Sequence, residues 1–225
     1  MKKIISRIRF YCKIRLFQYL YLNYFCKNII RTDQSRIIPY AGAVMEMEPG
    51  AKVYLGGGDI ELGCDRLKGS KTETFVRIRR DAVWSSEGGC RIAYGSTVEI
   101  LCGGLLDSGF FSMNSGSIMI AAKRIRLGRN VMIGRGVVIY DSDHHTIRNL
   151  EGKLANLYAP VEIGDHVWLA TNVMVLKGST IGSGSMIAAN AMVSGSVPPD
   201  CMYRAENTAV IRKNYGVWSR EHPQE

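Results

Sequence analysis

The feature that most constrains this chain is a period of six residues in its C-terminal half. An aliphatic residue opens each of six consecutive blocks, at Ile163, Leu169, Val175, Ile181, Ile187 and Val193. The same phase occurs earlier at Leu127, Ile133 and Ile139, and a weaker copy at Tyr94, Ile100 and Leu106. An α-helix repeats every 3.6 residues and a strand every 2, so neither explains the pattern. A strict period of six fits a solenoid with flat faces.

The period also specifies the shape of one coil. If each block forms one short strand and a turn, three blocks close a triangular coil of about 18 residues. The leading aliphatic side chain then points inward and stacks on its counterpart in the next coil. A small residue follows it in most blocks, as a tight corner requires. The sequence therefore predicts a parallel β-helix, and the unbroken register disfavours a β-sandwich with regularly spaced turns.

These repeats resemble the left-handed parallel β-helix of the hexapeptide-repeat acyltransferases. The resemblance is close over residues 90–213 and looser over 38–90. It implies an all-β fold, a homotrimer and active sites in clefts between adjacent coils and subunits.

Three segments are expected along the chain. Residues 1–37 form a basic amphipathic helical segment, and residues 38–213 form the β-helix acetyltransferase domain with an inserted loop at 140–160. Residues 214–225 form a C-terminal tail that we expect to cap the end of the solenoid.

The positive charge of the chain is concentrated at its N-terminus. Residues 1–31 hold eight Lys or Arg and no acid, which supplies +8 of the net +9. The nearly neutral remainder excludes a basic nucleic-acid-binding domain. Apolar and aromatic residues at helical spacing predict an amphipathic α-helix, which either lies on an anionic membrane surface or packs on its own domain or a neighbouring subunit.

The expected location is cytoplasmic, at the inner membrane face if the basic helix binds lipid. The apolar stretch from Leu16 to Cys26 is too short to span a bilayer, and no signal-peptide cleavage site follows it. The six cysteines are scattered without a C-x-x-C pair, which excludes a zinc ribbon or a thioredoxin-type site and favours reduced thiols.

The repeat is interrupted once, after Ile139, by a segment that contains two of the four histidines. His144 and His145 lie there, beside Asp141 and Asp143. Imidazole suits a general base because its pKa lies near neutral pH. A carboxylate on the far ring nitrogen would orient it, and we expect Asp143 or Asp141, or a backbone carbonyl in their place, in that role. Direct transfer between two bound substrates then needs no Ser or Cys nucleophile.

The segment DSDHHTI resembles the catalytic segment of the xenobiotic and sugar O-acetyltransferase branch. Alignment on Ile147 places the catalytic histidine at His145, whereas counting back from Pro160 places it at His144. We favour His145. His166 lies within a repeat block, and we expect it to have a structural role in a turn.

The stretch PVEIGDHVWLATNVMVLKG resembles the most recognisable block of this family, which implies acetyl-CoA as co-substrate and no metal. Small residues suit contact with the slender pantetheine arm, and a cation suits the nucleotide phosphates. The positions carried over from the family are Trp168, Ala170, Thr171, Ala189, Ser194, Arg212 and Lys213.

We therefore expect an acetyl-CoA-dependent O-acetyltransferase. The tail NYGVWSREHPQE resembles relatives that modify capsule or O-antigen sugars, so the expected acceptor is a sugar hydroxyl in surface-polysaccharide biosynthesis. Alternatives are acetylation of a xenobiotic or small free sugar, a γ-carbonic-anhydrase-like zinc lyase, and an inactive scaffold. The zinc alternative is disfavoured because its only candidate ligands, His144, His145 and His166, are spaced unlike that family's.

Overall fold

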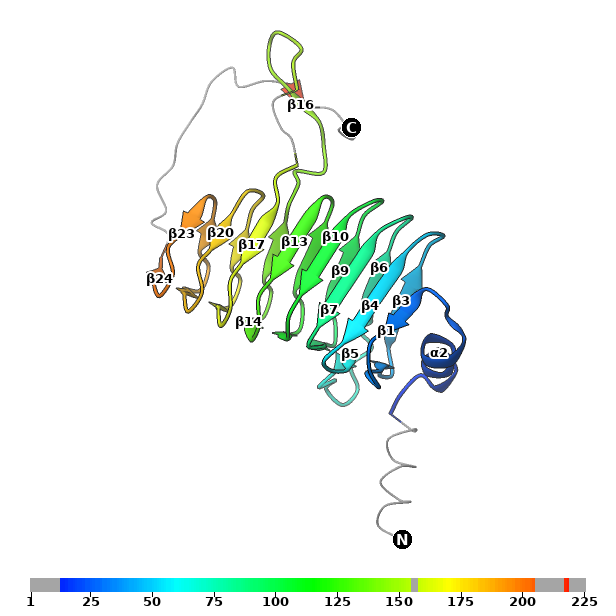
Figure 1. The fold of residues 1–225 in the computed structure, drawn as a ribbon. Helices are drawn as coiled ribbons and strands as arrows, with labels where there is room; N and C mark the ends of the chain where they lie inside the picture. Colours follow the sequence, from blue (N-terminus) through cyan, green and yellow to red (C-terminus); the bar gives the residue numbers. More distant parts are fainter. Residues whose placement is uncertain (1–12, 155–157, 205–216, 219–225) are drawn as a thin grey trace.

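The protein is a left-handed parallel β-helix, a triangular prism built from three parallel sheets. The structure is a computed structural model that describes residues 13–154, 158–204 and 217–218. Figure 1 shows the coils stacked in chain order from the N-terminal to the C-terminal end. The predicted fold class is confirmed, including a short helix before the first coil.

The chain passes through sheets 1, 2 and 3 in turn, so each sheet gains one strand per coil. The strands of sheet 1 are β1 (Ile29–Arg31), β4 (Lys52–Gly56), β7 (Val83–Glu87), β10 (Leu105–Ser108), β13 (Arg124–Leu127), β17 (Val161–Ile163), β20 (Thr180–Ile181) and β23 (Ser196–Val197). Those of sheet 2 are β2 (Ile37–Pro39), β5 (Ile60–Cys64), β8 (Cys90–Ala93), β11 (Phe111–Met113), β14 (Val131–Ile133), β18 (Trp168–Leu169), β21 (Met186–Ile187) and β24 (Met202–Tyr203). Those of sheet 3 are β3 (Ala43–Met47), β6 (Thr74–Ile78), β9 (Thr97–Ile100), β12 (Ile118–Ala121), β15 (Val138–Tyr140), β19 (Met174–Val175) and β22 (Met192–Val193).

The C-terminal coils have the length that the period predicts. Trp168 pairs with Met186, and Met174 with Met192, which is a step of 18 residues per coil. All six leading aliphatic residues from position 163 to 193 are at most 2% exposed and stack inside the prism. This column of side chains is the hydrophobic core, and its burial provides the main stabilisation of the fold.

Asparagines support the corners between sheets 2 and 3. Asn172 and Asn190 occupy the same corner in successive coils, each with a left-handed backbone (φ of 57° and 59°). Asn tolerates this conformation better than most residues. The Asn172 side-chain amide donates to Asn190 Oδ1 at 3.2 Å, which links one coil to the next.

The N-terminal coils are longer and less regular. The step from Val83 to Leu105 is 22 residues, and the step from Lys52 to Val83 is 31. Extra residues at the corners change the repeat length without changing the inward stacking. Strand β1 begins at Ile29, within the segment expected over residues 1–37, and pairs with β4 of the next coil.

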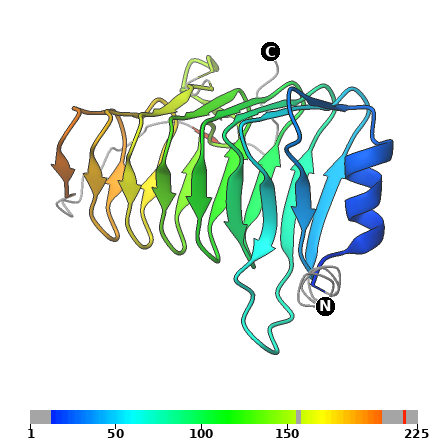
Figure 2. The same cartoon turned by 60° about the horizontal axis from the view of Figure 1, so that its bottom comes forward.

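The helical N-terminal segment packs on the first coil. It consists of α2 (Leu16–Leu20) and a π-helical turn, η1 (Tyr21–Phe25). Tyr19 and Leu22 are each 2% exposed, whereas Phe17 is 89% exposed and Phe25 71%. Figure 2 shows this helix against the N-terminal end of the prism. Residues 1–12, with much of the predicted basic charge, lie outside the described residues.

Candidate active site

A single loop interrupts the coils at the edge where sheet 3 passes into sheet 1, which we call the 3–1 edge. The chain leaves the prism after β15 and returns at β17 (Figure 1). The loop therefore has the position that the broken repeat predicts. Residues 141–160, of which 155–157 are not described, are called the histidine loop.

Asp141 anchors the base of the histidine loop. Its carboxylate is fully buried and accepts backbone N–H bonds from Ala122 and Lys123 at 2.7 Å and from Arg124 at 2.6 Å. Burial raises the pKa of this carboxyl, and the three backbone hydrogen bonds oppose that shift. The group expected as an alternative orienting carboxylate is thus bonded to the preceding coil.

His144 packs into the base of the loop. Its backbone is left-handed, with φ of 60°, and its ring makes an edge-on contact with the Tyr140 ring at a centroid distance of 4.9 Å. Its Nδ1 lies 3.5 Å from Ser142 Oγ. Burial is the largest effect on this group and lowers the pKa of His144, which favours the neutral imidazole.

His145 is exposed on the loop, next to an ion pair that ties the loop to the following coil. Its backbone N–H donates to the Asp143 carbonyl at 2.7 Å. The Asp143 carboxylate accepts from Lys177 Nζ at 2.6 Å, and Lys177 lies at the 3–1 edge one coil further on. We did not predict Lys177; the signal available for it was its position in the family-like block ending VLKG.

The C-terminal tail pairs with the histidine loop. Strand β16 (Ile147–Arg148) runs antiparallel to β25 (Val217–Trp218). The two described tail residues therefore pair with the histidine loop, and the rest of the tail that we expect to cap the solenoid lies outside the described residues. A two-stranded ladder formed with the loop is the observed arrangement, and no sequence period marks it.

The residues expected at the acyl donor lie along other parts of the prism. Trp168 in β18 is 47% exposed on sheet 2. Ala170 and Thr171 follow it at the edge between sheets 2 and 3, the 2–3 edge, and Ala189 lies there one coil later. The Asn190 N–H donates to the Thr171 carbonyl at 2.9 Å, which places these corners directly against each other.

Ser194 does not join that group. It follows β22 and lies on the 3–1 edge, the same edge as the histidine loop. Arg212 and Lys213 lie outside the described residues. The chain thus presents the histidines and the small-residue corner at opposite ends of the sheet 3 strands, so the described residues of the predicted set do not all come together.

His166 has the structural position that the sequence suggested. It adopts a left-handed backbone with φ of 55° in an exposed turn, and its Nδ1 lies 2.8 Å from Asn130 Nδ2. Among the residues that the structure describes, no three His, Cys, Asp or Glu side chains gather in a geometry suited to a metal ion. The five described cysteines are free thiols.

Comparison with known proteins supports the repeat and the fold. The model of the bacterial transferase hexapeptide (six repeats) matches residues 160–195. The putative lipopolysaccharide biosynthesis O-acetyl transferase WbbJ of Escherichia coli K12 is 31% identical over 40% of this chain and 50% of its own length. The polysialic acid O-acetyltransferase of Neisseria meningitidis is 44% identical over 30% of this chain and 32% of its own length.

The chain spans about half or less of the length of the curated relatives it matches. The solved structure of the polysialic acid O-acetyltransferase OatWY superposes with a TM-score of 0.54 at 20% identity, over 86% of this chain and 90% of the other, and shares its fold. The six-residue period and the three-sheet prism agree with the matched model, so residues 160–195 of this chain are similar to the hexapeptide repeats of bacterial transferases.

Proposed function

We propose that this protein transfers an acetyl group from acetyl-CoA to a hydroxyl group of a sugar in a surface polysaccharide, such as a capsule or an O-antigen. The observation that carries the proposal is the histidine loop, the longest excursion from the coils among the described residues, which Asp141 anchors and which exposes His145. The names of two partial relatives, a lipopolysaccharide and a polysialic acid O-acetyltransferase, support a glycan acceptor.

In this proposal His145 acts as the general base. It takes the proton of the sugar hydroxyl as that oxygen attacks the thioester carbonyl carbon, and the carbon–sulfur bond then breaks. The imidazolium returns the proton to the leaving thiolate. His145 is preferred to His144 because it is exposed to an arriving acceptor, whereas the His144 ring packs on Tyr140. Asp143, paired with Lys177, would fix the position of the loop and of the charges near His145.

The separation of the predicted groups supports a homotrimer. Histidines on the 3–1 edge of one protomer and small residues on the 2–3 edge of another would together form the cleft. There Trp168, Ala170, Thr171 and Ala189 would contact the pantetheine arm, because small exposed residues let a slender chain lie against the backbone. Ser194, Arg212 and Lys213 remain proposed contacts for the rest of acetyl-CoA.

An apolar ladder on sheet 2 supplies a surface for that assembly. Met132, Trp168, Met186 and Met202 pair in register on successive strands and are 39–71% exposed. Contiguous exposed apolar side chains of this kind mark protein interfaces, and Met adapts well to them.

The N-terminal segment is proposed to hold the enzyme at the cytoplasmic face of an anionic membrane. Phe17, Tyr21, Tyr24 and Phe25 are 56–89% exposed. Within the described residues, the structure has no helix with the length and apolarity needed to cross a bilayer. Sedimentation with anionic vesicles tests the proposal: binding should weaken in high salt and be lost in a chain that begins at Asn28.

Mass spectrometry of cell-surface glycans tests the function itself. Cells with the wild-type protein should carry O-acetylated sugars, and cells with no protein or with His145→Ala should lack them. Unchanged glycans, together with acetylation of a small free sugar or xenobiotic by the purified protein, would replace the polysaccharide acceptor with that alternative.

A further inference from the structure

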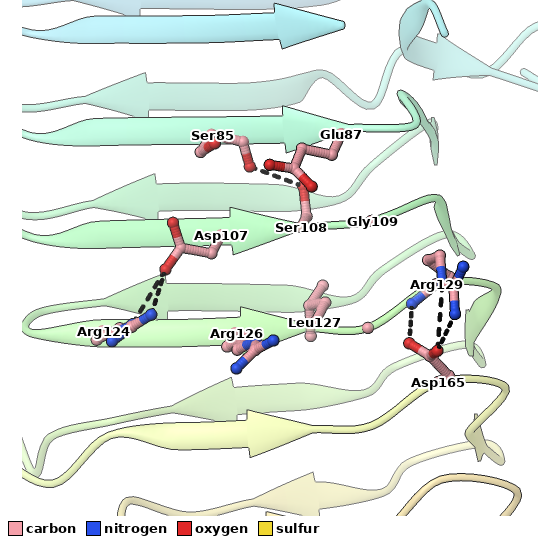
Figure 3. A pocket seen from close by; sticks show the side chains of 11 residues that line it. Ser85, Glu87, Asp107, Ser108, Gly109, Arg124, Arg126, Leu127, Arg129 and Asp165 are labelled. Atoms are coloured by element: carbon pink, nitrogen blue, oxygen red, sulfur yellow. Dashed lines mark hydrogen bonds and ion pairs between the residues drawn. The ribbon is translucent and has the colours of Figure 1, made fainter. Parts of the chain in front are cut away.

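A polar groove crosses the outer face of sheet 1. Two adjoining hollows of about 540 and 350 Å³ share Ser85 and Glu87 as lining residues. The larger also contains Asp107, Arg126 and Asp165, and Figure 3 shows Asp107 and Arg126 on neighbouring strands and Asp165 at the corner beside Arg129. Together the two hollows, which we call the sheet 1 groove, run across the strands and not along them.

The strand register arranges the groove residues in a row. Tyr54, Ser85, Asp107, Arg126 and Glu162 are direct neighbours on β4, β7, β10, β13 and β17. Neighbouring strands lie about 4.8 Å apart, so the row spans about 19 Å. Its spacing is close to the length of one sugar unit along an extended glycan. The row offers an aromatic face, a hydroxyl, carboxylates and a guanidinium, which are the groups that bind sugar rings and their substituents.

Arg126 is the cation of the groove that is available to a ligand. Arg124 is paired with Asp107 at 3.0 Å, and Arg129 with Asp165 at 2.8 Å. The Arg126 side chain is exposed and makes no hydrogen bond or ion pair within the described residues, as Figure 3 illustrates, although, after hydrogen bonds from Arg129, its charge helps to lower the pKa of Asp165. A guanidinium in this state is suited to bidentate binding of a carboxylate.

The surrounding acids narrow the choice of ligand. The lining acids Glu87, Asp107 and Asp165, with Glu162 beside them, would repel a ligand that has anionic groups but few hydroxyl donors, such as a nucleic acid. A glycan with one carboxylate per sugar can instead place a carboxylate on Arg126 and donate its hydroxyls to the neighbouring carboxylates. One available cation beside several carboxylate acceptors therefore favours an acidic polysaccharide, which supplies both carboxylates and hydroxyl donors.

The groove also adjoins the histidine loop. The backbone N–H of Arg124, at the start of β13, donates to Asp141 at the base of the loop. The chain returns from the loop at Val161, the first residue of β17, and β17 pairs directly with β13. A glycan in the groove would therefore lead toward His145.

We propose that the sheet 1 groove binds several sugars of an acidic polysaccharide and presents that polymer to the histidine loop, with Arg126 as its carboxylate-binding residue. The proposal rests on the proposed acetyl transfer and adds the acceptor class and its binding face.

Binding of a defined polymer tests the groove without catalysis. The full chain is titrated with polygalacturonate, with neutral dextran of equal length and with single-stranded DNA. Polygalacturonate should bind, and Arg126→Gln should weaken that binding about tenfold through loss of one charge-assisted contact. Arg80→Gln, which removes an exposed arginine outside the groove, should leave it unchanged. Equal binding by wild type and Arg126→Gln, no binding by wild type, or equally tight binding of DNA would overturn the proposal.

Kinetics separates the groove from the proposed function. Arg126→Gln should raise the KM for an acidic polymer about tenfold, with kcat and transfer to a monosaccharide unchanged. Acetylation of the polymer with an unchanged KM would refute the groove and leave the function intact. Loss of polymer binding in Arg126→Gln, combined with no acetyl transfer by wild type to any acceptor, would refute the function and leave the groove intact.

Discussion

Replacement of Asp141 should destabilise the protein far more than replacement of its neighbour Asp143. Asp141 is fully buried and holds three backbone N–H groups at 2.6–2.7 Å. A hydrogen bond to a charged group contributes about 1.5–3 kcal/mol, and a buried donor left without an acceptor costs about 1–3 kcal/mol. Water can reach part of the corner because Lys123 and Arg124 are exposed, so we discount the sum and expect about 3–5 kcal/mol for Asp141→Ala.

Thermal unfolding at one fixed protein concentration measures this effect. At about 2–4 °C per kcal/mol for a chain of this size, the midpoint of Asp141→Ala should fall by roughly 10 °C. Asp143→Ala is the control: its partly exposed ion pair with Lys177 should contribute at most about 1 kcal/mol. Equal midpoints for the two variants would refute the reasoning that Asp141 anchors the histidine loop.

Three further predictions concern the loop, its titration and the assembly. Removal of residues 214–225 takes away the partner of β16, so amide exchange at Ile147 and Arg148 should accelerate while the thermal midpoint of the prism changes little; unchanged exchange would contradict the β16–β25 ladder. Burial lowers the pKa of His144, so the folded state favours the neutral imidazole. The contribution of His144 to the free energy of unfolding is therefore complete above the ordinary pKa of histidine and is lost as pH falls through the lowered pKa. Wild type should therefore lose more stability between pH 7 and pH 5 than His144→Gln does, and parallel pH profiles would contradict this. Met186→Glu should convert a particle near three times 25.0 kDa into monomers. Thr180→Glu, in the same coil on sheet 1, should leave the particle intact. A wild-type monomer, or a Met186→Glu variant that remains a trimer, would exclude the sheet 2 ladder as the interface.

The C-terminal coils were predictable because each block of six residues forms one short strand and one corner and buries one aliphatic side chain. A buried aliphatic such as Leu169 must recur at a fixed distance if it is to stack on its counterpart. The N-terminal coils conceal the same stacking, since the step from Lys52 to Val83 includes a loop that alters the count. No six-residue period marks strand β1, which begins at Ile29.

The histidine loop was predictable from the interruption of the period, but its internal contacts were not. The Asp143–Lys177 pair joins residues 34 positions apart, and that contact depends on how successive coils stack. Asp141 similarly meets a corner that precedes it by one coil. The row of sheet 1 that contains Arg126 was also not predictable. Its residues become neighbours only through the stacking of coils of unequal length, and the sequence does not reveal those lengths.

Acetyl transfer by the purified protein tests the central claim most directly. The full chain is supplied with acetyl-CoA and an acidic polysaccharide, and both CoA release and O-acetyl groups on the polymer are measured. Wild type should O-acetylate the polymer, and His145→Ala should lower the rate by about 10²–10⁴-fold while acetyl-CoA binding persists. Near-normal turnover by His145→Ala would contradict the assignment of His145 as the base, and absence of transfer by wild type to polymer, free sugar and xenobiotic acceptors would contradict the account as a whole.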